Sequence, residues 1–123
     1  MSYVLTDSIL ITIKKMLGFE ADYEHYDMDL IILINACIRE LYQLGIGEKE
    51  FAVNGMEQTW TEYLGEAIGL YDDAKSYIYY KVRLAFDPPS NSFVTNSIQE
   101  LLKETAWRLT VAADEKRIDN INE

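Results

Sequence analysis

Apolar residues recur along this chain at the three- and four-residue spacing that places them on one side of an α-helix. Four segments show the pattern, over residues 7–17, 27–44, 71–86 and 93–112. Glycines follow the first two segments, and Pro88-Pro89 follows the third, where it pushes the backbone out of helical geometry. The pattern predicts an all-α fold, a small four-helix bundle that forms one domain over residues 1–112.

The segment between the second and third long helices breaks the helical pattern. Asn54-Gly55 lies between residues that tolerate β-structure, over residues 48–58. Asn-Gly is the commonest signal for a tight hairpin turn, so we expect a short hairpin or an irregular projecting loop. Thr59 and Glu62 then have the spacing of a capping box, which predicts a short helical turn that ends at Gly65.

Residues 113–123 carry many charged side chains and few apolar ones. Helices in small proteins are held mainly by an apolar face, which this segment lacks. We expect the last helix to end at Ala112 and a flexible C-terminal tail to follow it.

The second predicted helix has an unusual feature in its first half. Residues 30–34 are apolar without interruption, so apolar side chains surround the helix on every side. An amphipathic surface helix does not need this arrangement. Either the helix is central in the bundle, or part of its surface is buried against another subunit.

Composition narrows the function classes. The chain of 123 residues is 49% hydrophobic, with nine Tyr and two Trp, so it has ample material for a core and for protein interfaces. Its formal net charge is −10, which disfavours binding of nucleic acid or an anionic membrane. The basic clusters Lys14-Lys15 and Lys81-Val82-Arg83 are expected to be salt-bridge partners or solvated faces.

Membrane insertion and secretion are not expected. The longest strongly apolar stretch, residues 30–34, is far shorter than the roughly 20 residues that span a bilayer. The first twelve residues lack the basic region and cleavage site of a signal peptide.

The sequence contains no specific catalytic, metal or cofactor motif. Cys37 lies among apolar residues, and the single histidine, His25, is about three helical turns away in an acidic loop. Asp72 and Asp73 are adjacent, so on a helix they point about 100° apart and suit the helix N-terminus better than catalysis. We expect no catalytic residue, no metal ligand set and no cofactor, and hence no enzyme.

Several segments together resemble a known family. They are ILITIKKMLG at 9–18, residues 29–35, LYQLGIG at 41–47, Trp60, AKSYIYYKVRLAFDPPSNSF at 74–93, and ETAWRL at 104–109. The chain is similar, over about residues 7–113, to the small head-tail connector (adaptor, or head completion) proteins of long-tailed phages of Gram-positive bacteria. The Tyr-Ile-Tyr to Asp-Pro-Pro-Ser block is the specific part of the resemblance.

The resemblance implies a structural virion protein. Such proteins form a ring, expected to be dodecameric, beneath the portal protein, and they join the filled head to a stopper or tail-completion protein. DNA passes through the axial channel without specific binding. The place implied is the virion neck, with the host cytoplasm as the site of assembly.

Candidate contact residues follow from this reading. The chosen subunit-interface residues are Ile32, Leu33, Tyr79, Tyr80 and Trp107. The chosen portal or tail contacts are Phe51, Val53, Met56, Arg117, Ile118 and Ile121. Loop tips and chain ends suit such contacts because they can become ordered on a partner without disturbing the core.

Two other functions compete with the connector. The first is an acidic DNA mimic or inhibitor that binds a host nucleic-acid enzyme, which would need its acids on one exposed face. In the sequence the acids fall mainly at helix starts and in loops. The second is an unrelated helical adaptor or regulatory dimer, which oligomer mass would distinguish from a ring.

Overall fold

The structure, a computed structural model, describes residues 7–65 and 68–122, without the side chains of residues 68 and 116–122. Its elements are α2 (Ile9–Met16), α3 (Asp27–Gln43), α4 (Trp60–Leu64), the 3-10 turn η1 (Ile68–Leu70), α5 (Tyr71–Phe86) and α6 (Ser92–Asn122). No strand occurs within these described ranges. The predicted all-α fold with four main helices is confirmed.

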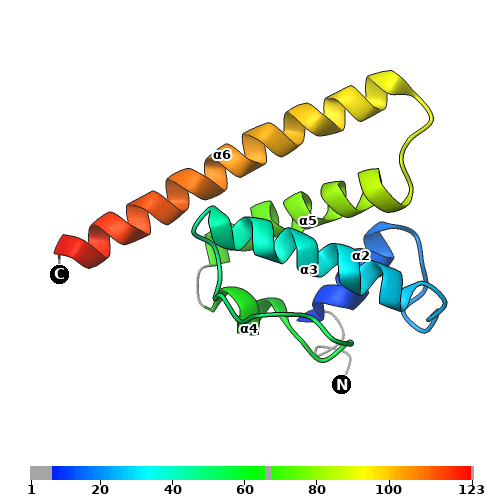
Figure 1. The fold of residues 1–123 in the computed structure, drawn as a ribbon, viewed down its shortest axis with the longest axis horizontal. Helices are drawn as coiled ribbons and strands as arrows, with labels where there is room; N and C mark the ends of the chain where they lie inside the picture. Colours follow the sequence, from blue (N-terminus) through cyan, green and yellow to red (C-terminus); the bar gives the residue numbers. More distant parts are fainter. Residues whose placement is uncertain (1–6, 66–67, 123) are drawn as a thin grey trace.

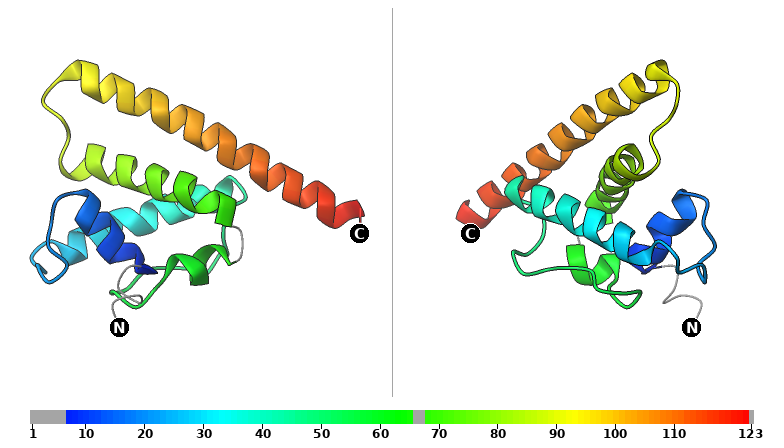
Figure 2. Two further views of the ribbon diagram at one scale, coloured as in Figure 1. Left: turned by 180° about the vertical axis from the view of Figure 1, so that it is seen from behind. Right: turned by 45° about the vertical axis from the view of Figure 1, so that its right-hand side comes forward.

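Helix α5 occupies the centre of the fold, because α2, α3 and α6 all pack against it. Figure 1 shows α6 running alongside α5 after the turn that joins them, with α3 on the other side of α5. Figure 2 shows the same order of helices from two further directions. The second long helix is therefore not central, and one side of α3 is left without a helix to cover it.

The core is built from the predicted apolar stripes. Helices α2 and α3 contribute Ile9, Leu10, Ile13, Leu30, Ile34, Ile38 and Leu41; α4, α5 and α6 contribute Trp60, Tyr63, Ala74, Ile78, Val82 and Leu109. Trp60 is completely buried, and its indole Nε1 donates a hydrogen bond to Thr12 Oγ1 at 3.1 Å. This bond connects α4 to α2 across the core.

The helix ends follow the predicted signals. The Ser8 hydroxyl accepts a hydrogen bond from the Ile11 backbone N–H and so caps α2. Thr59 and Glu62 form the complete capping box of α4. Gly18 and Gly45 adopt positive φ directly after α2 and α3, where most other residues would be strained.

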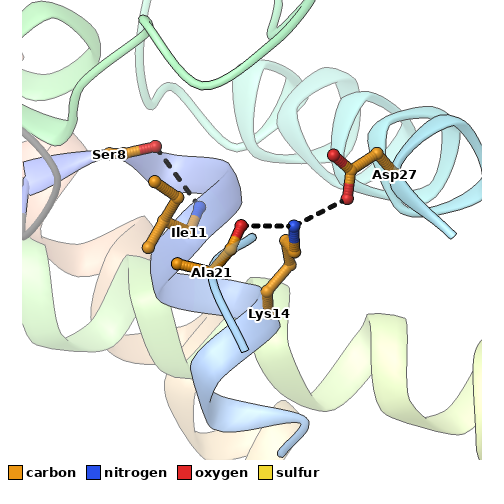
Figure 3. A network of polar contacts seen from close by, with 5 residues as sticks. All are labelled: Ser8, Ile11, Lys14, Ala21 and Asp27. Atoms are coloured by element: carbon orange, nitrogen blue, oxygen red, sulfur yellow. Dashed lines mark hydrogen bonds and ion pairs between the residues drawn. The ribbon is translucent and has the colours of Figure 1, made fainter. Parts of the chain in front are cut away.

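Lys14 is buried within this helical core. Its ammonium lies 2.9 Å from Asp27 Oδ1 and donates a hydrogen bond to the Ala21 carbonyl oxygen at 2.8 Å (Figure 3). A buried ammonium is tolerated only when it is paired and hydrogen-bonded, and both conditions hold here. Lys14 therefore fastens the loop between α2 and α3 to the start of α3.

Removing the partners of this ion pair should have unequal effects. Asp27→Asn leaves the Lys14 ammonium buried without its counter-charge, so we expect the free energy of unfolding to fall by about 2 kcal/mol. This loss is smaller than that for a fully buried ion pair, because the Asp27 side chain is 20% exposed. Lys14→Met replaces the charge with an apolar chain of similar length, so we expect a loss of about 1 kcal/mol or less. Urea titrations followed by circular dichroism measure both. Equal losses would show that Lys14 is not held by Asp27.

Of the two alternatives expected for residues 48–58, a short hairpin or an irregular projecting loop, the structure has the irregular loop. A hairpin with an Asn-Gly turn needs positive φ at both central residues, and neither Asn54 nor Gly55 has it. Instead the Gln58 side-chain oxygen accepts hydrogen bonds from the backbone N–H groups of Asn54 and Gly55, and its amide donates to Asn54 Oδ1. The side chain of Gln58 thus accepts the backbone hydrogen bonds that a partner strand would accept in a hairpin.

The end of the last helix expected at Ala112 is wrong, because α6 continues as a helix to Asn122. Directly after Ala112 come Ala113, Glu115, Lys116 and Arg117, residue types that have high helix propensity. Extending an existing helix costs little compared with starting one. The low number of apolar residues after Ala112 therefore indicates where the helix leaves the body of the protein. It does not indicate where the helix ends.

Candidate functional site

The groups considered for catalysis do not form a reactive site. The Cys37 thiol is buried, and burial, followed by the nearby Glu40 carboxylate, raises its pKa to about 12. A thiolate is therefore disfavoured at neutral pH. His25 is exposed, with its ring packed edge-on against Tyr26. Within the described residues, no three His, Cys, Asp or Glu side chains are grouped to hold a metal ion.

A polar cluster joins α3 to α5. The Tyr77 hydroxyl donates a hydrogen bond to Glu40 Oε2 at 2.9 Å, and Lys81 Nζ lies 3.5 Å from the same oxygen. Burial, and then the hydrogen bond to Glu40, raise the pKa of Tyr77 above its ordinary value. A neutral tyrosine, a carboxylate and an ammonium satisfy one another here, so this cluster has a packing role and confirms Lys81 as a salt-bridge partner.

Two helix faces present apolar side chains to solvent. On α3, Met28 and Ile32 are 71% and 62% exposed, and Arg39 is exposed on the same side. We call these three residues the α3 face. On α6, Phe93 and Trp107 are 76% and 67% exposed, and Glu100 and Glu104 lie between them on the same side. These four residues are the α6 face.

The predicted interface residues fall into two groups. Ile32 and Trp107 are strongly exposed, on α3 and α6 respectively. Leu33, Tyr79 and Tyr80 are half-buried, and the two tyrosine rings contact each other at a centroid distance of 5.1 Å. The structure thus places the chosen residues on three different helices, and Ile32 and Trp107 have the most surface left for a partner.

The residues chosen as portal or tail contacts also differ. Val53 is only 2% exposed, so it is a core residue and its assignment to a contact surface was wrong. The Asn35 side chain donates to the Val53 carbonyl and accepts from its N–H, both at 2.8 Å. Phe51 is half-buried against Tyr63, and Met56 keeps 38% exposure. The side chains of Arg117, Ile118 and Ile121 lie outside the described residues, although their backbone belongs to α6.

Sequence reasoning missed Met28 and Phe93, which are the two most exposed large apolar side chains described. A signal was available for Met28. It precedes Ile32 by four residues, so both belong to one side of α3, away from the core stripe of Leu30, Ile34 and Leu41. A second apolar stripe on one helix indicates a second partner.

The fold and its surface define a class of protein: a helical protein whose surplus apolar faces suit assembly with other chains. None of the described helices combines the length and apolar content needed to cross a bilayer. A family model described as phage connector protein matches residues 9–116. The chain belongs to this phage connector family, whose members are structural and not enzymes. No curated protein and no solved structure matches the chain.

Membership of this family implies association with other virion proteins. It confirms the resemblance drawn from the sequence at the level of the family. The match does not bear on the host of the phage.

Proposed function

We propose that this chain is a head-tail connector that forms a ring beneath the portal protein and joins the DNA-filled head to a stopper or tail-completion protein. The observation that carries the proposal is the family match over residues 9–116. The uncovered α3 and α6 faces support it, because each chain keeps two separate apolar surfaces that a ring neighbour on either side can cover. On this proposal the protein lies in the virion neck and assembles in the host cytoplasm. The Gram-positive host rests on the sequence resemblance alone.

The acidic character of the chain suits a channel through which DNA moves. With a net charge of −10, a ring would repel the phosphate backbone and not retain it. We expect weak DNA binding by the assembled ring, with little dependence on salt concentration. Tight binding that falls steeply with added salt would contradict a passive channel.

Two segments are the proposed contacts with axial partners. One is the loop around Met56, whose side chain is exposed while the loop itself is pinned to α3 through Asn35. The other is the end of α6, which carries Arg117, Ile118 and Ile121 and extends beyond the body of the fold (Figure 1). Met56 can be changed without removing a core side chain.

Cofractionation with portal protein tests the proposal. The chain should co-sediment with portal rings or portal-bearing heads. A chain truncated after Glu115 keeps Ala113, which packs against the core, so it should fold as the full chain does but fail to join the head. A full-length chain that does not co-sediment with portal protein would overturn the connector function. Binding to a host nucleic-acid enzyme as a monomer would favour the acidic mimic instead.

A further inference from the structure

We infer that the α3 face of one copy packs against the α6 face of a second copy, with Ile32 opposite Trp107 and Arg39 opposite Glu100. This pairing rests on the proposed ring, and it names the surfaces that would form it. Because the two faces are different, each chain would use α3 toward one neighbour and α6 toward the other. Such a head-to-tail contact repeats around a closed ring.

The charges on the two faces are complementary. Arg39 is exposed on α3 and has no ion-pair partner among the described residues. On α6, Glu104 is exposed and also lacks an ionic partner there, and Glu100 meets only Lys103, in a contact where both side chains are more than 70% exposed. The α3 face thus has a cation beside its apolar residues, and the α6 face has carboxylates between its two aromatic residues, so each face offers the charge that the other lacks.

The spacing of these residues agrees with an antiparallel contact. Ile32 and Arg39 are seven residues apart on α3, and so are Trp107 and Glu100 on α6. Seven residues of helix span about 10 Å, so the apolar pair and the charged pair can form together. Beside Trp107, the residues Lys103, Glu104 and Arg108 form a shallow, open surface of α6, against which a branched side chain such as Ile32 can pack.

Pairing of each face with its own copy is less favourable. Two antiparallel α6 faces that place Phe93 opposite Trp107 also place Glu100 opposite Glu100, since Glu100 is midway between the two aromatic residues. Like charges placed opposite each other oppose association. Two α3 faces would leave Trp107 of α6 without a partner. Charge thus disfavours the α6–α6 pairing, and the uncovered Trp107 disfavours the α3–α3 pairing, which leaves the mixed pairing.

Cysteine cross-linking tests the geometry directly. Ile32→Cys and Trp107→Cys chains should form a disulfide-linked dimer when they are mixed under mild oxidation, and neither should do so alone. A chain with both substitutions should give a ladder of dimers, trimers and higher species. The native Cys37 is buried and should not contribute. Lys49→Cys, at an exposed loop position outside both faces, replaces Ile32→Cys in the control mixture.

Charge reversal tests the ionic pair independently. Arg39→Glu and Glu100→Arg should each weaken association by about tenfold or more, measured by sedimentation velocity, and the double variant should recover most of that loss. Lys49→Glu makes the same charge change as Arg39→Glu, but at a position outside both faces. Its association should therefore match that of the unaltered chain. Recovery in the double variant separates a direct pair from a general effect of charge.

All assays are run with the chain alone and with portal protein present. Cross-linking of either single variant with itself, or no cross-link in the mixture under both conditions, would overturn the pairing. If the chain binds portal but these cross-links fail, the pairing is wrong and the connector function stands. If the cross-links form but portal is not bound, the pairing stands and the connector function fails.

Discussion

Replacing Trp60 with alanine is expected to lower the free energy of unfolding by about 4 kcal/mol, the largest loss predicted for any single side chain. The indole is completely buried, and its N–H donates to Thr12 on α2. Lys75 Nζ lies 5.5 Å from the ring centroid, so α5 also contacts it. The substitution removes a large apolar volume, one hydrogen bond and a cation–π contact at the point where three helices meet. Urea unfolding followed by circular dichroism measures the loss.

Trp107 provides the matched control, because it is the same residue type with 67% of its surface exposed. Trp107→Ala should change the stability of the monomer by less than about 0.5 kcal/mol. The measurement is made at protein concentrations low enough to prevent assembly, since association adds stability. If Trp60→Ala does not fold, Trp60→Phe gives a smaller loss that can still be compared. Similar losses at the two tryptophans would contradict the description of the core.

Replacing Gly47 with alanine is expected to cost about 3 kcal/mol, from two separate causes. Gly47 has φ +85°, a conformation that residues with a side chain rarely adopt. A Cβ atom there would also lie 2.5 Å from Cε1 of Tyr63. Tyr63 cannot easily move away, because it is buried and stacked on Phe51. The strain and the clash should therefore both reduce stability.

Gly18→Ala separates the two causes. Gly18 has a similar φ of +95°, but nothing lies within 4 Å of the position of its Cβ. We expect this control to lose only the conformational part, about 1 kcal/mol. Chemical denaturation of both variants gives the difference. A Gly47→Ala loss no larger than that of Gly18→Ala would show that the Tyr63 ring is free to shift.

Local signals were sufficient to predict most of the fold. The start of α3 at Asp27, the end of α5 at Phe86 and the capping box at Thr59 all agree with the structure within a residue. These features depend on neighbours in the sequence: caps, glycines and prolines act over three or four residues. The arrangement of helices around α5 depends on contacts between distant segments, and helix periodicity does not encode these.

The errors have the same physical origin. From the sequence, Val53 is expected in a projecting loop. In the structure the Asn35 side chain, 18 residues earlier, binds both backbone polar groups of Val53. Lys14 is a salt-bridge partner, one of the two expected roles, but its burial was not expected, because it depends on the Ala21 carbonyl in the loop after α2 and on Asp27 at the start of α3. In each case a long-range polar partner decided whether the residue is buried, and residue type alone does not indicate such a partner.

The candidate surface was predicted in part. The apolar run at residues 30–34 indicated more apolar surface than one subunit covers, and Ile32 does remain 62% exposed while Leu30 and Ile34 enter the core. Trp107 is also exposed, at 67%, and its place in a subunit interface stays a prediction. Tyr79 and Tyr80 were weaker choices, because aromatic residues serve cores and interfaces equally well and the sequence did not distinguish these roles.

The unbroken α6 helix sets a length scale for the particle. Its 31 residues correspond to about 46 Å, and among its described side chains, up to Glu115, the last that packs against the core belongs to Ala113. The nine residues from there to Asn122 add about 13 Å of rod beyond that anchor. On the proposed connector function, this rod would let each subunit reach about that far toward the next layer of the neck while its globular body stays in place.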